Sequence, residues 1–213
     1  KADPRLFHTV ALPGLPYKYN TELIYKNDWN RNSNVYGFYA SLKENVDPSC
    51  SCFRNINPFR ANSKNRIVIR YADVLLMRAE ALIELNRSNE ALPLINQVRQ
   101  RAKQSTSMIP YATNANIALY QDGVNITWNQ ENARKALRWE RRLEFAMEGS
   151  RFFDLVRWGI ADQVLNDYFT KEKTRRPAIF SSAYFTKNKN EYIPIPQNQI
   201  GYVKGIYKQN AGF

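Results

Sequence analysis

Two glutamates, Glu140 and Glu144, stand four residues apart in the stretch LRWERRLEFAMEGSRFFDLVRWG, residues 137–159. On a helix both carboxylates project from one face about one turn apart, an arrangement that a general acid and a general base could share. The stretch also carries five arginines and five Trp or Phe residues. Three roles therefore compete: a catalytic carboxylate pair, a basic and aromatic nucleic-acid surface, or an ion-pair lattice that builds the fold.

The arginines beside these glutamates argue against catalysis. A neighbouring guanidinium lowers the pKa of a carboxyl group, whereas a general acid needs a raised pKa. Leu137 and Met147 lie on nearly the same helix face, which directs the glutamates inward, where carboxylates persist only when cations pair with them. We expect a structural ion-pair lattice formed by Arg138, Glu140, Arg141, Arg142, Glu144, Arg151 and Asp154.

Enzymatic activity is not expected, and no residue is assigned a catalytic role. The motifs GxSxG, GxxxxGK[ST], HExxH and GxGxxG are all absent. The sequence therefore lacks the usual motifs of hydrolases, nucleotide-binding proteins and metalloproteases. The glutamate pair remains a minor hydrolase alternative.

Nucleic acid is not expected as a partner either. The net charge is +12, but the basic residues are scattered along the chain, and in residues 137–159 five cations face four anions. A nucleic-acid surface needs an excess of cations on one face with exposed rings for stacking. The rings of this stretch are expected in the core: Trp139, Phe145, Phe152, Phe153 and Trp158.

The chain's two cysteines, Cys50 and Cys52, have one residue between them. With His8 as the single histidine, they cannot complete a zinc site within this chain. We expect them to be unpaired or bridged locally in a loop. A bridge would be strained if the backbone were extended, because the Cα atoms of such a pair lie near the upper limit for a disulfide.

Alternating acidic and amide side chains in the loop NDWNRNSNVYGFYA, residues 27–40, prompt a test for calcium. The alternating residues are Asp28, Asn30, Asn32 and Asn34. An EF-hand loop also needs a glycine at its sixth position and a glutamate at its twelfth, where this chain has Ser33 and Tyr39. We therefore expect no metal and no cofactor, with calcium in another loop geometry as the remaining alternative.

The same loop is our candidate ligand site, because it combines aromatic rings with amides and an arginine. Flat rings beside hydrogen-bonding groups suit a sugar, whose faces are apolar and whose rim is hydroxylated. The candidate residues are Trp29, Arg31, Asn34, Tyr36 and Tyr39, with Trp128, beside Asn125 and Asn129, as a weaker candidate. The alternative is that these rings only pack the loop onto the helices.

Three segments differ in their hydrophobic pattern. The sequence predicts loops with short strands for residues 1–65 and helical hairpins for residues 66–170. Residues 171–213 are predicted to be extended, because Pro194 and Pro196 disfavour a helix. Apolar residues at helical spacing predict helices over about 67–86 and 89–103, with Asn86 ending the first and Ser88 capping the second. A second pair is expected over 131–147 and 150–169, split at Gly149. The expected fold is mainly α, with tetratricopeptide-like hairpins.

No run of about 18 apolar residues occurs, so no membrane span is expected. The first ten residues, KADPRLFHTV, also lack the order of a signal peptide.

Several stretches, taken in order, resemble one family. They are DPRL at residues 3–6 followed by Thr9, RYADVLLMRAEALIELN with NEALPLINQVRQRA, RWERRLEFAMEGSRFFDLVRWG, and a terminal YIPIP with QNAGF. Together they resemble the C-terminal half of SusD/RagB proteins. A minor departure is QNAGF, where the family commonly has proline before the final glycine.

The resemblance implies a SusD-type fold and a function: capture of oligosaccharide or another nutrient for a TonB-dependent, SusC-like outer-membrane transporter. It also implies a location at the outer-membrane cell surface, with a lipid anchor on an N-terminal cysteine absent from this chain. The missing N-terminal half of the same protein is a further expected partner, and Lys1 is taken as a cut point. The shared motifs are structural and carry no ligand residues across.

Overall fold

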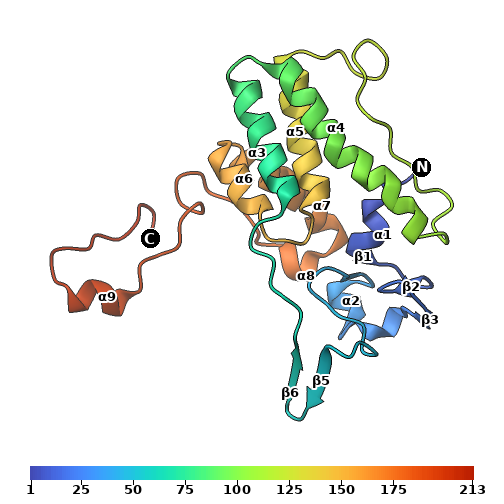
Figure 1. Cartoon of the computed structure of the whole chain (residues 1–213). Helices are drawn as coiled ribbons and strands as arrows, with labels where there is room; N and C mark the ends of the chain where they lie inside the picture. Colours follow the sequence, from blue (N-terminus) through green and yellow to red (C-terminus); the bar gives the residue numbers. More distant parts are fainter. The chain divides into compact units, whose positions relative to one another are not determined.

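Three long helices form the largest core of the chain: α3 (Tyr71–Glu84), α4 (Ser88–Gln104) and α5 (Gln130–Glu144). They lie side by side in Figure 1. The computed structural model describes residues 1–213, which divide into two compact units, Lys1–Gly149 and Ser150–Phe213. The fold is mainly α with few short strands, as the sequence predicts.

The first unit also contains short elements around the three helices. They are α1 (Arg5–Thr9), η1 (Asn27–Trp29), α2 (Ser33–Tyr36), η2 (Ser105–Met108), and the strands β1 (Val10–Ala11), β2 (Pro16–Tyr17), β3 (Asn20–Ile24), β4 (Ala40–Ser41), β5 (Phe53–Ile56) and β6 (Phe59–Asn62). The strands form three antiparallel pairs, β1–β4, β2–β3 and β5–β6. Since each pair has only two strands, stability must come from packing around them.

The helices predicted from apolar spacing form as α3 and α4, although α3 begins at Tyr71 and not near residue 67. Leu76, Ala79 and Ile83 of α3 are fully buried against Ala91 and Ile95 of α4. Burial of a Leu or Ile side chain stabilises a fold by about 1.5–3 kcal/mol. Packing of these helices therefore holds the first unit together.

The connection between α3 and α4 is as tight as the sequence predicts, with one difference. Asn86 has φ +62°, the left-handed conformation that ends a helix. The residue before α4 is Arg87, which makes no side-chain cap, and Ser88 is already the first helical residue. The expected capping by Ser88 is therefore wrong.

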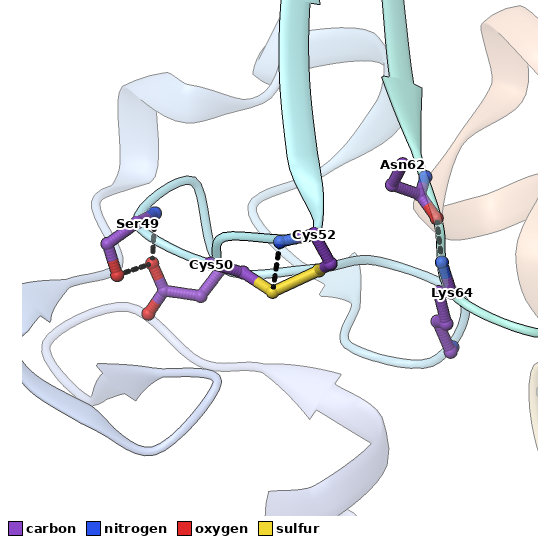
Figure 2. Close-up of a disulfide and its surroundings, with 6 residues drawn as sticks. Ser49, Cys50, Cys52, Asn62 and Lys64 are labelled. Carbon is purple, nitrogen blue, oxygen red and sulfur yellow. Dashed lines mark hydrogen bonds between the residues drawn. A yellow bond between two sulfur atoms is a disulfide. The ribbon is translucent and has the colours of Figure 1, made fainter.

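The cysteines form a local disulfide at the base of the β5–β6 hairpin (Figure 2), and no free cysteine remains. Their Cα atoms are 5.1 Å apart, within the usual range for a disulfide. A turn brings them together, in which the Phe53 amide donates to the Cys50 carbonyl at 2.9 Å. The extended geometry considered from the sequence does not occur.

The second unit contains four helices: α6 (Arg151–Arg157), α7 (Ala161–Arg175), α8 (Pro177–Phe180) and α9 (Gln197–Tyr202). Its core gathers Leu155, Ala161 and Phe185. The Asn166 carboxamide exchanges two hydrogen bonds with the Phe185 backbone, at 2.9 and 2.8 Å.

Two predictions for this unit are wrong. A single helix over 150–169 does not form, because Gly159 has φ +66° and separates α6 from α7. The segment 171–213 is not wholly extended, since α8 and α9 lie within it. Pro177 opens α8 and Pro196 directly precedes α9, positions at which the missing amide costs no helical hydrogen bond.

None of the helices combines the length and apolar character needed to cross a membrane.

Candidate functional site

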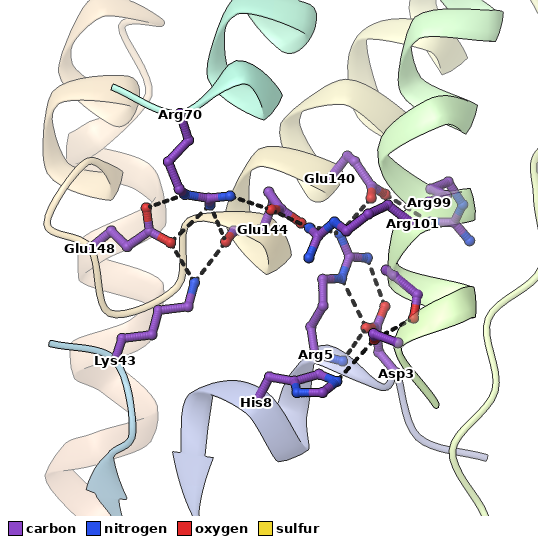
Figure 3. Close-up of polar contacts among 12 residues, drawn as sticks. Asp3, Arg5, His8, Lys43, Arg70, Arg99, Arg101, Glu140, Glu144 and Glu148 are labelled. Carbon is purple, nitrogen blue, oxygen red and sulfur yellow. Dashed lines mark hydrogen bonds and ion pairs between the residues drawn. The ribbon is translucent and has the colours of Figure 1, made fainter. Parts of the chain in front are cut away.

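Glu140 is the most deeply buried member of an ion-pair network (Figure 3). Its side chain is fully buried, and its two oxygens accept from Arg5 Nη1 at 2.5 Å and Arg99 Nη1 at 2.8 Å. Arg5 is itself held by Asp3, whose oxygens lie 2.9 Å from Nε and 2.7 Å from Nη2. Glu140 therefore links α5 to α1 through Arg5 and to α4 through Arg99.

Glu144 occupies the next turn of α5 and is 2% exposed. Arg70 Nη1 donates to its Oε1 at 2.7 Å, Arg101 contacts the same oxygen, and Arg5 Nη1 lies 3.4 Å from Oε2. Burial alone raises the pKa of Glu144, but the charge of Arg101 and the hydrogen bond and charge of Arg70 outweigh burial and lower it. A carboxyl group held ionised in this way cannot act as a general acid near neutral pH.

The network extends to the C-terminal side of α5. Lys43 Nζ donates to the Glu144 carbonyl at 2.8 Å and to Glu148 Oε1 at 2.5 Å. Arg70 also reaches Glu148, with Nη2 to Oε1 at 2.9 Å. Charged groups from distant parts of the sequence thus meet at the C-terminal end of α5, and their ion pairs stabilise the fold.

The other arginines of the proposed lattice have different surroundings. Arg141 donates to Asp73 of α3 at 2.8 Å and lies over the Phe145 ring. Arg142 is exposed and lies over the Trp139 ring, so its place in a buried lattice is wrong. Two helical residues turn the chain by about 200°, so Arg142 faces away from Glu140 and Glu144.

Arg138 is half-buried and stands two residues before Glu140, on another face of α5. Arg151 and Asp154 belong to the second unit, where the buried Asp154 accepts from Arg157 Nη2 at 3.0 Å and Arg151 lies over the Trp158 ring. The charges of residues 137–159 are therefore divided between two units.

The expectation that the rings of this stretch fill the core holds only in part. Phe145 is buried, but Trp139 is 50% and Phe153 70% exposed. Met147 is exposed as well, because α5 ends at Glu144 and residue 147 leaves the helical face that Leu137 occupies.

Trp29 is half packed and half exposed. It ends η1, is 42% exposed, and contacts the rings of Tyr17 and Tyr25 edge-on, with centroid distances of 5.5 and 5.3 Å. Tyr25 is buried with Ala11 and Leu42 in a small core beside β1 and β4. The Trp29 indole is thus held by two neighbouring rings while part of it stays exposed.

Arg31, Asn34, Tyr36 and Tyr39 are all exposed. The loop that carries them is closed by Asn30, whose Nδ2 donates to the carbonyls of Gly37 at 3.0 Å and Tyr39 at 2.7 Å. These two hydrogen bonds hold the Tyr39 backbone beside the residue that follows Trp29. The loop is thereby given a defined backbone, although most of its side chains face solvent.

Trp128 is a core residue, and its proposed ligand role is wrong. It is 8% exposed, packs in the α3–α5 core, and donates from Nε1 to the Ser88 carbonyl at 2.9 Å. The neighbouring amides are also in use: Asn129 caps α5 by accepting from the Asn132 amide, and Asn125 donates to the Leu119 carbonyl.

Residues 1–213 contain no group of three or more His, Cys, Asp or Glu side chains that could hold a metal ion. His8 Nδ1 lies 2.8 Å from Tyr19 Oη, and Nε2 lies 2.9 Å from Ser105 Oγ. In the calcium-like loop, the Asn30 carboxamide binds the loop backbone.

The arginines around Glu140 and Glu144 are the residues that sequence reasoning missed. They are Arg5, Arg70, Arg99 and Arg101, and each lies at least 41 residues from the glutamate that it contacts. Nothing in the local stretch indicates these pairs. All four arginines do lie in motifs shared with the SusD/RagB family, namely DPRL, RYAD and NQVRQRA, and this was the one indication of a structural role.

Two solved structures resemble the chain closely enough to share its fold. A SusD homolog from Bacteroides thetaiotaomicron matches with a TM-score of 0.65 at 24% identity, covering 99% of this chain and 41% of that one. A SusD-like protein from Bacteroides fragilis matches with a TM-score of 0.65 at 19% identity, covering 99% and 39%. At these identities the likeness establishes the fold.

Curated relatives from Formosa agariphila match at the level of sequence. SusD-like protein P25 is 35% identical over 183 residues, or 82% of this chain and 30% of the relative. SusD-like protein P2 is 30% identical over 159 residues, or 74% and 28%. The chain therefore spans less than a third of the length of these relatives.

The model of the SusD family matches residues 1–213, the whole of the chain. The match agrees with the helical core, with both sets of relatives and with the order of the motifs. This protein chain belongs to the SusD family.

Proposed function

We propose that this chain is part of a non-catalytic cell-surface protein that binds an oligosaccharide or another nutrient and delivers it to a TonB-dependent, SusC-like outer-membrane transporter. The observation that carries the proposal is the loop of Trp29, Tyr36 and Tyr39, whose rings are 42%, 64% and 60% exposed. Exposed aromatic side chains that gather in one loop can form an interaction site, and their flat rings match the apolar faces of sugar rings. Membership of the SusD family supports this role.

The location belongs to the same proposal. The protein would be held at the outer-membrane surface by a lipid on an N-terminal cysteine outside residues 1–213. Cys50 and Cys52 are bonded to each other and so do not supply this anchor.

A second observation concerns protein partners. Helix α3 is apolar on two faces: one packs on α4 and α5, and the other exposes Tyr71, Val74 and Met77, with Leu85 exposed just after the helix ends. An apolar stripe of this kind normally packs against another helix. We propose that the remaining part of a longer protein covers it, since the matched relatives are several times longer than this chain.

This second surface also favours the alternative function, a helical-repeat module that binds only other proteins. The two functions differ in the residues that they need. Sugar binding depends on the loop of residues 27–39, whereas protein binding depends on the outer face of α3.

The test is titration calorimetry of the intact protein against a panel of oligosaccharides, followed by Trp29→Ala and Tyr39→Ala. We expect at least one sugar to bind, and both variants to bind it more weakly while their melting temperatures stay unchanged. If both variants bind the sugar as well as the wild type does, the site assignment fails. If the intact protein binds its transporter but no sugar, the protein-binding alternative replaces the proposal.

A further inference from the structure

Tyr25 lies beneath the exposed loop and carries a buried polar group with no partner. Its side chain is only 2% exposed, and its hydroxyl makes no hydrogen bond. The backbone around it is fixed, because the Tyr25 amide donates to the Leu15 carbonyl at 3.0 Å and its carbonyl accepts from Gly14 at 2.9 Å. The ring is thus held firmly while the hydroxyl is left unsatisfied.

A buried hydroxyl without a partner is uncommon and costs free energy, because the group has given up its bonds to water. Phenylalanine could fill the same space without that cost. No protein group satisfies the hydroxyl, so its partner must come from outside the protein, as water or as a ligand.

The surroundings of Tyr25 indicate what kind of partner would suit it. Burial alone raises the pKa of Tyr25, so the hydroxyl keeps its proton and can both donate and accept. A suitable partner must therefore offer a hydrogen-bond donor or acceptor. A sugar hydroxyl is neutral and offers both a donor and an acceptor.

Tyr25 belongs to a cluster of three aromatic rings that reaches the surface at Trp29. Tyr17 stacks on Tyr25 with a centroid distance of 6.3 Å, and Trp29 meets both rings edge-on. Trp29 is the most exposed of the three and ends the short element η1. It can therefore move with the least loss of packing.

We propose that Trp29 shifts from Tyr25 to stack on an oligosaccharide, and that the freed Tyr25 hydroxyl then hydrogen-bonds a hydroxyl of the same sugar. The inference rests on the proposed function and adds the group that recognises the sugar's rim. Trp29 supplies an apolar surface, which many sugars match. Tyr25 supplies a fixed polar contact, which selects for the position of a hydroxyl.

The test is Tyr25→Phe in the intact protein, with Tyr207→Phe as the matched control at an exposed tyrosine of the second unit. Affinity for a bound oligosaccharide is measured by calorimetry, and stability by urea unfolding. We expect Tyr25→Phe to weaken binding by about threefold to tenfold, the value of one hydrogen bond, and to leave stability unchanged or raised. Tyr207→Phe changes neither quantity.

Three outcomes would overturn the inference. Binding by Tyr25→Phe at wild-type affinity shows that the hydroxyl does not touch the sugar, while the proposed function stands. Loss of stability in Tyr25→Phe shows that the hydroxyl is bonded within the intact protein. If the wild-type protein binds no oligosaccharide, the proposed function fails and the inference fails with it.

Discussion

The buried network around Glu140 and the exposed loop of residues 27–39 differ in how their polar groups are satisfied. In the network, every oxygen of Glu140 and Glu144 has an arginine partner, supplied by other segments of the first unit. In the loop, one amide closes the backbone and the rings remain exposed. The paired charges of the network stabilise the fold. The exposed rings of the loop are the candidate contacts for a ligand.

The largest effect is expected from Glu140→Ala. Removing this carboxylate leaves Arg5 and Arg99 buried without their shared anion, and breaking a buried pair in this way costs about 3–5 kcal/mol. Urea unfolding measures the loss. Glu131→Ala is the control, because Glu131 lies on the same helix in an exposed pair with Lys135 and its removal should change stability little. Equal losses in the two variants would contradict the structural role of Glu140.

A second large effect is expected in acid. The pKa values of Glu144 and Asp3 are lowered from ordinary values of 4.5 and 3.8. For Asp3, burial alone raises the pKa, but the hydrogen bond and charge of Arg5 outweigh it. A lowered folded-state pKa means that the unfolded chain binds protons first as pH falls. The stability that these groups supply is therefore complete above about pH 4.5 and is lost below it.

Urea unfolding at a series of pH values measures this effect. Glu144→Gln should flatten the decline between pH 5 and pH 3, since one of the two carboxylates no longer titrates. A decline as steep as that of the wild type would mean that Glu144 does not contribute.

A smaller effect is expected from Asn30→Ala, which removes the two hydrogen bonds that close the loop. Each such bond is worth about 0.5–1.5 kcal/mol, but the loop lies outside the helical core, so the loss should appear as local opening. Hydrogen exchange at residues 30–39 should become faster while the melting temperature changes little. A large fall in melting temperature would show that the loop is part of the cooperative core.

The sequence predicts local features well and distant ones poorly. The apolar spacing of α3 and α4 identifies their buried faces, because periodicity reports directly on one helix. Inference from composition fails for Trp128. Its neighbouring amides suggest an exposed loop, whereas the ring packs among three helices. Gly159 shows the same limit, because a glycine in a helical pattern is tolerated at some positions and ends the helix at others.

The candidate loop could be located from composition, but its internal structure could not. Exposed aromatic and amide residues are visible in the sequence, and the structure finds Trp29, Arg31, Asn34, Tyr36 and Tyr39 exposed. The ring contacts from Tyr17 and Tyr25, and the unpaired Tyr25 hydroxyl, depend on how β2 and β3 place those residues. Such contacts between segments leave no pattern in a single sequence.

Two exposed tryptophans in the first unit allow the most direct test of the central claim. Trp29 belongs to the loop and is 42% exposed, while Trp139 belongs to α5 and is 50% exposed. The measurement is the Kd of the intact protein for a bound oligosaccharide in Trp29→Ala and Trp139→Ala, with folding verified by melting temperature. We predict a loss of about tenfold or more for Trp29→Ala, equivalent to about 1.4 kcal/mol, and no change for Trp139→Ala. Equal affinities in the two variants, or a loss confined to Trp139→Ala, would contradict the assignment of the loop as the binding site.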